Sequence, residues 1–227
     1  LATDALLAGW WENFLQSQKE LFQWDEAAYL PEQVVTTTLE GFRLLAKYDL
    51  FVMTKQGTYL IYDWKTYRRR PHREQIAQKV QTRLYPFTLL HSGHFLPQIA
   101  PSVQHPEVQR FANHWKLSDY LPENLKLVYW YANYPGQPEI FTYTKHQFQQ
   151  DQLYLSRLIR SIANLAQSEQ TGDFPMTTHS ERCLFCVYRS LCDRGSRAGD
   201  WDQDLPETEL QVTLDDFDFE HISEIEF

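Results

Sequence analysis

Two carboxylates and one ammonium group follow each other closely in the first third of the chain. Asp49 lies in one apolar stretch, and Asp63 and Lys65 end the next one. Side chains alternate along a strand, so Asp63 and Lys65 should point to one face and Trp64 to the other. Two carboxylates gathered at strand ends beside a lysine are typical of a divalent-metal site that hydrolyses phosphodiesters. Asp49 and Asp63 would then bind Mg2+ or Mn2+, helped by a backbone carbonyl near Trp64.

Polar side chains on the next segment could complete such a site. Apolar residues at helical spacing predict a helix over 73–90, with Pro86 kinking or dividing it. Gln81 and Tyr85 fall on a stripe beside its apolar face. Lys65 would neutralise charge on a phosphate or lower the pKa of the attacking water.

A basic patch directly follows the strand that carries Asp63. It consists of Arg68, Arg69, Arg70 and Arg73. Such a patch is often only a solvated surface. Because it lies beside the candidate site, we give equal weight to a role in binding DNA phosphates.

The remaining pattern predicts strands and helices in alternation. Three strands should form an antiparallel meander, with Pro31 ending the linker before them and a turn at Glu40 and Gly41. The expected strands are 34–38, 42–48, 58–65, 125–131 and 140–143, and the expected helices are 3–23, 73–90, 108–115 and 144–166.

Charge is unevenly distributed along the 227 residues. The net charge is −9, but residues 200–227 hold eleven acids and no Lys or Arg, which leaves residues 1–199 with 19 acids and 21 bases. We expect one globular domain over 1–199 and an acidic tail over 200–227, either solvated or docked on the basic body as a DNA mimic. No apolar run reaches transmembrane length and no signal peptide is evident, so we expect a cytoplasmic protein with no membrane partner.

All three cysteines fall within ten residues. Cys183, Cys186 and Cys192 form an odd, tight cluster, which favours metal binding over disulfides. With His179 they would complete a Cys3His zinc site, whereas iron–sulfur clusters usually take four thiolates. The third alternative is that the three cysteines bind no metal.

Taken in chain order, these motifs resemble those of a known family. Asp49, Asp63-x-Lys65, Gln81-x3-Tyr85 and Cys183-x2-Cys186-x5-Cys192 resemble the PD-(D/E)xK nuclease superfamily, in particular its RecB-like branch with a C-terminal iron–sulfur cluster. That branch includes AddB-type nucleases and the CRISPR-associated exonucleases.

The resemblance implies a restriction-endonuclease-like α/β core, with a mixed central sheet flanked by helices, and Mg2+-dependent DNA cleavage. Asp49 and Asp63 would be the metal ligands and Lys65 the catalytic lysine, while Gln81 and Tyr85 would orient the active site or the DNA strand. The three cysteines would hold the iron–sulfur cluster. DNA and a helicase or CRISPR-adaptation protein would be the partners.

The sequence departs from that pattern in two ways. The family usually has a His or Glu on a helix before the first strand and an additional, earlier cysteine. Glu12 could replace the acid, or both residues could lie upstream of Leu1. Two other functions therefore stay open: a catalytically inactive DNA-binding or scaffold subunit, and a zinc-stabilised interaction domain.

Overall fold

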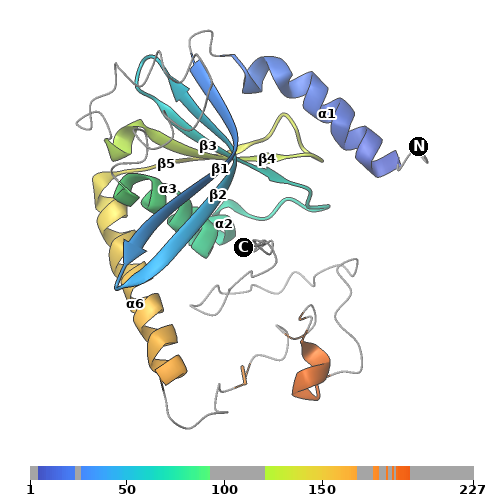
Figure 1. Cartoon of the computed structure of the whole chain (residues 1–227). Coiled ribbons are helices and arrows are strands. Elements are labelled where there is room, and N and C mark those ends of the chain that lie inside the picture. The colour runs from blue at the N-terminus through green and yellow to red at the C-terminus, as the bar shows by residue number, and fades with distance from the viewer. Residues whose placement is uncertain are drawn as a thin grey trace. The chain divides into compact units, whose positions relative to one another are not determined.

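A five-stranded sheet is the centre of the structure, which is a computed structural model (Figure 1). Its strands, in order across the sheet, are β1 (Ala27–Leu39), β2 (Phe42–Thr54), β3 (Tyr59–Lys65), β4 (Leu125–Tyr131) and β5 (Glu139–Thr142). β1, β2 and β3 form an antiparallel meander, β3 and β4 run parallel, and β5 returns antiparallel to β4. The mixed sheet of an α/β restriction-endonuclease-like core is therefore confirmed.

The structure describes residues 5–23, 27–92, 121–167, 176–178, 183, 186 and 188–194. The helices are α1 (Ala5–Leu21), α2 (Arg73–Gln78), α3 (Val80–Ser92) and α6 (Lys145–Gln167), with the 3-10 turns η2 (Pro122–Asn124) and η4 (Arg189–Cys192). The chain divides into two units inside α6, between Ile159 and Arg160. The helix expected over 108–115, the domain boundary at 199 and the acidic tail lie outside the described residues.

The first strand starts earlier than predicted. β1 begins at Ala27, so the expectation that Pro31 ends a linker is wrong. Proline is compatible with this position because β1 is an edge strand, where a missing backbone N–H need not remove a ladder hydrogen bond. The turn to β2 has positive φ at Glu40 (52°) and Gly41 (81°), the backbone of a type I′ hairpin.

The β1–β2 hairpin changes the direction of its side chains halfway along. Tyr48 and Phe51 enter the same core cluster, although residues three apart in a regular strand lie on opposite faces. Glu32 and Asp49 fall between the paired residues Pro31 with Leu50 and Gln33 with Tyr48, and Glu32 has a left-handed φ of 53°. The hairpin therefore bends at Glu32 and Asp49, and the bend turns Tyr48 toward the helices.

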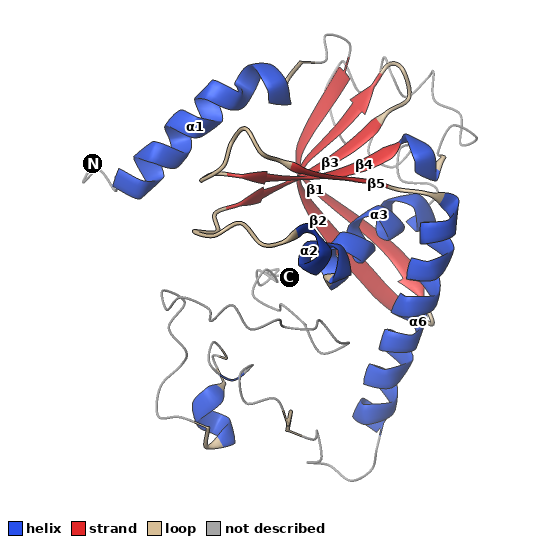
Figure 2. Ribbon diagram, turned by 180° about the vertical axis from the view of Figure 1, so that it is seen from behind, coloured by secondary structure: helices blue, strands red, loops and turns tan. Residues whose placement is uncertain are grey.

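The two faces of the sheet are covered by different helices (Figure 2). On one face, Phe14 of α1 packs edge-on against Trp64 and Trp130, with ring centroids 6.1 Å apart in each case. On the other face, α2 and α3 contribute Ile76 and Leu89 to the larger core cluster. Asp63 and Lys65 belong to the α2/α3 face, as the alternation of β3 predicts.

The helix expected over 73–90 is divided, but at Lys79 and not at Pro86. Lys79 has an extended backbone, with φ −61° and ψ 141°. The Ile76 carbonyl accepts both the Lys79 amide, at 3.1 Å, and the Thr82 hydroxyl, at 2.6 Å. These two bonds end α2 and lead into α3, and Pro86 lies buried within α3.

Candidate active site

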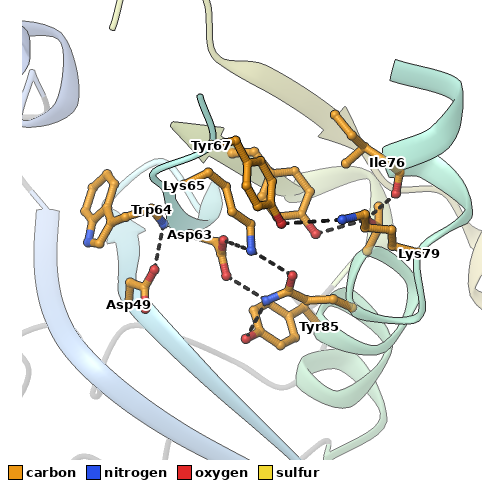
Figure 3. A network of polar contacts seen from close by, with 11 residues as sticks. Asp49, Asp63, Trp64, Lys65, Tyr67, Ile76, Lys79 and Tyr85 are labelled. Carbon is orange, nitrogen blue, oxygen red and sulfur yellow. Dashed lines mark hydrogen bonds and ion pairs between the residues drawn. The ribbon is translucent and has the colours of Figure 1, made fainter. Parts of the chain in front are cut away.

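The structure brings together the five residues predicted from sequence as catalytic (Figure 3). Asp63 and Lys65 come from β3, Asp49 from β2, and Gln81 and Tyr85 from α3. Asp63 and Lys65 are buried, with 4% and 7% of their surfaces exposed, and the other three are half-buried. A charged pair is thus held inside the protein, next to groups that solvent still reaches.

Lys65 is held by two side chains. Its Nζ lies 2.7 Å from Asp63 Oδ2 and 2.9 Å from Gln81 Oε1. Burial by itself would lower the pKa of Lys65, but the negative charge of Asp63, helped by Tyr67 and Asp49, outweighs it and raises the pKa above its usual value. Lys65 therefore stays protonated at neutral pH and can stabilise negative charge, but it cannot serve as a base.

The Gln81 amide joins three members of the site. Its Oε1 accepts from Lys65, and its Nε2 donates to Asp63 Oδ1 at 2.8 Å and to the Tyr85 hydroxyl at 2.9 Å. A primary amide can do this because it has an acceptor oxygen and a donor nitrogen with two hydrogens. The Tyr85 carbonyl in turn accepts the Tyr48 hydroxyl at 2.9 Å, which fixes α3 against β2.

Asp49 lies inside β2, so the expectation that it ends a strand is wrong. Asp49 nevertheless lies just outside the pairing of β2 with β3, whose last pair at this end is Leu50 with Tyr62. The amide of Trp64, beyond that pair, donates to Asp49 Oδ2 at 2.6 Å. Because N–H and C=O of one residue point to the same side of an extended strand, the Trp64 carbonyl is also directed toward β2.

The electrostatics of the two carboxylates favour a cation. Burial, followed by the charge of Asp63, raises the pKa of Asp49 to about 6, against the opposing effects of the Trp64 amide and Lys65. Two carboxylates close enough to repel each other offer the hard oxygen ligands that Mg2+ and Mn2+ prefer. Since a carboxylate has about four lone-pair sites, Asp63 can keep its partners and still ligate a metal.

The residues present therefore fit a divalent ion, held by Asp49, Asp63 and the Trp64 carbonyl. Within the described ranges, no group of three or more His, Cys, Asp or Glu side chains is placed to bind one metal ion. Sites for Mg2+ commonly use only one or two carboxylates, so a set of two carboxylates and a carbonyl suits that ion.

The four arginines of the predicted basic patch form two groups that differ in their contacts. Arg68 and Arg69 are exposed, whereas Arg70 and Arg73 form ion pairs with Glu139 of β5. Arg73 Nη1 lies 2.5 Å from Glu139 Oε2, and Arg73 Nη2 donates to the Ile140 carbonyl of β5 at 2.9 Å. Arg70 and Arg73 thus fasten the β3–α2 connection to β5, a structural role that the prediction of DNA contact did not include.

The candidate replacement for the missing acid does not reach the site. Glu12 is exposed on α1, which covers the sheet face of Trp64 and Trp130, opposite to that of Asp63. The suggestion that Glu12 completes the active site is therefore wrong.

The cysteines belong to the second unit of the chain. The Cys186 amide donates to the Cys183 carbonyl at 3.3 Å, and Arg194 Nη1 donates to Cys183 Sγ at 3.2 Å. All three thiols are among the described residues, yet they are not gathered into a group that could bind one metal ion. His179 lies outside those residues. The arrangement of the cysteines thus does not fit a cluster, and cluster binding stays a prediction.

Sequence reasoning missed three residues around Lys65. Its Nζ lies 5.9 Å from the Tyr67 ring centroid and 5.3 Å from that of Tyr129, and Lys79 Nζ lies 5.2 Å from the same Tyr67 ring. Tyr67 follows Lys65 by two residues, a spacing that could have suggested it. Tyr129 comes from β4, opposite Asp63 in the parallel register, and no local pattern indicates that pairing.

The family of this chain follows from a comparison of its sequence with protein families. The sequence profile of the PD-(D/E)XK nuclease superfamily matches residues 2–193. The crystal structure of SSO0001 is similar over 84% of this chain and 71% of that chain, with 16% identity and a TM-score of 0.43. The comparison with curated proteins yields no match. No helix within the described ranges is long and apolar enough to cross a membrane. The profile match includes most of the chain and every residue of the site, and the chain belongs to the PD-(D/E)XK nuclease superfamily.

Proposed function

We propose that this protein is a metal-dependent deoxyribonuclease that hydrolyses phosphodiester bonds at DNA ends or in single strands. The main support is the contact of Asp63 with both Lys65 and Gln81, beside Asp49 on the adjoining strand. A buried ion pair is expensive to maintain, and a hydrophobic pair would often be as stable. Its position next to a second carboxylate of raised pKa indicates a catalytic purpose.

Each side chain has a distinct task in the proposed reaction. A divalent ion bound here would polarise a phosphate oxygen and make a bound water a better nucleophile. Lys65, kept protonated, stabilises the negative charge that develops on the phosphate. Gln81 fixes the position of the Lys65 ammonium relative to the Asp63 carboxylate. The Tyr85 hydroxyl orients the Gln81 amide by accepting a hydrogen bond from its nitrogen.

The test is degradation of labelled single-stranded and duplex DNA in the presence of Mg2+ or Mn2+. We expect Asp63→Asn and Lys65→Met each to lower the cleavage rate by at least about 100-fold, since each removes charge that acts on the transition state. Lys126→Gln is the matched control, because Lys126 is half-buried on the opposite sheet face. Full activity in both site variants would rule out this site as the catalytic one.

A catalytically inactive DNA-binding subunit is the second candidate. The observation that favours it is the absence, within the described ranges, of a third acidic or histidine side chain at the site. Titration calorimetry with Mn2+ separates the two. A nuclease should bind the ion in the wild type and lose that binding in Asp49→Asn, whereas an inactive module should show no binding that depends on Asp49.

We also infer that the chain belongs to the RecB-like branch and acts in repair, recombination or defence, with a helicase or a CRISPR-adaptation protein as partner. The support is the order of the motifs from Asp49 to Cys192. Iron and sulfide analysis of anaerobically purified protein tests the cluster that this branch implies. Zinc in place of iron would instead favour the Cys3His alternative.

A further inference from the structure

Lys79 lies against the same aromatic ring as the candidate catalytic lysine. Its Nζ is 5.2 Å from the Tyr67 ring centroid and 3.4 Å from the Tyr67 hydroxyl, while Lys65 Nζ is 5.9 Å from that centroid (Figure 3). The two nitrogens are therefore no more than about 11 Å apart. Tyr67 thus gathers two ammonium groups on one side of the site.

Lys79 differs from its basic neighbours in having no carboxylate partner within the described ranges. Those neighbours form ion pairs: Lys65 with Asp63, Arg70 and Arg73 with Glu139, and Arg83 with Asp151. A half-buried ammonium group held by a ring and a hydroxyl still has donor capacity and positive charge to offer. An anion is the ligand that this arrangement suits.

The helix break at Lys79 is built by buried groups and is not a frayed end. The Thr82 hydroxyl, which supports the break through the Ile76 carbonyl, also contacts the Tyr129 hydroxyl at 2.9 Å. Thr82 and Tyr129 are 3% and 1% exposed. Interruptions inside a helix often mark functional positions, and this one presents Lys79 to the Tyr67 ring.

We propose that Lys79 binds a DNA phosphate next to the one at Lys65, and that Tyr67 positions both ammonium groups. This inference rests on the proposed function. Successive phosphates in one strand lie about 3.4 Å apart along the helix axis. A strand whose phosphate contacts Lys65 therefore has neighbouring phosphates within the roughly 11 Å that separate the two lysine nitrogens at most. Lys79 then contributes to holding the strand, and Lys65 to the chemistry.

The test is the salt dependence of DNA binding by the full chain. Binding of a labelled single-stranded DNA is measured by fluorescence anisotropy, with EDTA present to prevent cleavage. Loss of one phosphate contact should reduce the slope of log Kd against log salt by about 0.7. We expect that reduction in Lys79→Gln, and the wild-type slope in Lys79→Arg, Tyr67→Phe and the control Lys126→Gln. With Mg2+ and at low salt, Lys79→Gln should raise KM several-fold and leave kcat nearly unchanged.

The outcomes separate this inference from the nuclease proposal. A wild-type slope in Lys79→Gln, or an equal reduction in Lys126→Gln, overturns the role of Lys79 even if the wild type cleaves DNA. A Lys79-dependent slope in a protein that does not cleave overturns the nuclease proposal alone. If the wild type binds no DNA, both are wrong. If Lys79→Gln is less stable, its slope is measured under conditions where circular dichroism shows it folded; a wild-type slope there overturns the proposal, and a reduced slope that Lys79→Arg restores supports it.

Discussion

Gln81 is the side chain on which the geometry of the buried ion pair depends. It accepts from Lys65 and donates to Asp63 and Tyr85, so no other natural side chain of its size reproduces all three contacts. Gln81→Glu would replace the donor nitrogen with a second negative oxygen facing Asp63. We expect DNA cleavage to fall about 100-fold through kcat, as is typical when a group that orients catalytic residues is lost.

Tyr85→Phe is the matched variant for this prediction. It removes one hydrogen bond to Gln81 and introduces no charge. Its cleavage rate should fall by less than about tenfold, consistent with a neutral hydrogen bond worth about 1 kcal/mol. Equal losses in the two variants would contradict the bridging role of Gln81.

At the scale of residues, the sequence was informative where contacts are local. Asp63 and Lys65 share a face because strand side chains alternate, and Gln81 and Tyr85 meet because they lie four apart on a helix. The pairing of Arg70 and Arg73 with Glu139 could not be predicted, since Glu139 arrives from a strand more than sixty residues away.

Among the elements, α3 and α6 are joined by a buried polar network. Asp151 of α6 is 1% exposed, accepts the Tyr143 hydroxyl at 2.8 Å and pairs with Arg83 of α3 at 3.3 Å. Burial raises the pKa of Asp151 from 3.8 to about 6, against the opposing effects of Tyr143 and Arg83. The carboxyl is therefore neutral in the folded protein at mildly acidic pH.

This shift predicts how stability depends on pH. Because the folded pKa is higher than the unfolded one, the contribution of Asp151 is fully present below pH 3.8 and is lost as the pH rises through about 6. Asp151→Asn should lack this loss, whereas Asp151→Ala should lower the free energy of unfolding by about 3 kcal/mol, because Arg83 and Tyr143 lose their partner. Urea titrations of the three proteins between pH 4 and about 7 check this. Equal pH dependence in the wild type and Asp151→Asn would contradict it.

Element boundaries were predictable where periodicity continued and not where it was interrupted. The meander and the helix after Thr144 follow from regular apolar spacing. The bend at Asp49 and the break at Lys79 do not, because each depends on contacts from another element. Asp49 is held by the Trp64 amide, and the break at Lys79 is supported by Thr82 and Tyr129. Both interruptions lie at the candidate site, where local preferences often yield to function.

At the scale of the whole molecule, charge separates the chain into two parts. Residues 1–199 carry 19 acids and 21 bases, and residues 200–227 carry eleven acids without Lys or Arg. DNA binding depends strongly on electrostatic attraction, so an attached segment with this charge opposes association with DNA wherever it lies. The tail should therefore weaken DNA binding by the protein that contains it.

Neutralising the tail in the full chain tests this effect. Replacing its eleven Asp and Glu residues with Asn and Gln should tighten DNA binding several-fold at low salt, and the gain should shrink as salt screens the charges. A second variant, with Phe217, Phe219 and Phe227 replaced by Ser, keeps the charge and removes aromatic anchors. Tighter binding in both variants would indicate that the tail docks on the DNA-binding surface as a mimic. Tighter binding in the first alone would indicate long-range repulsion, and unchanged affinity in both would exclude any influence of the tail on DNA.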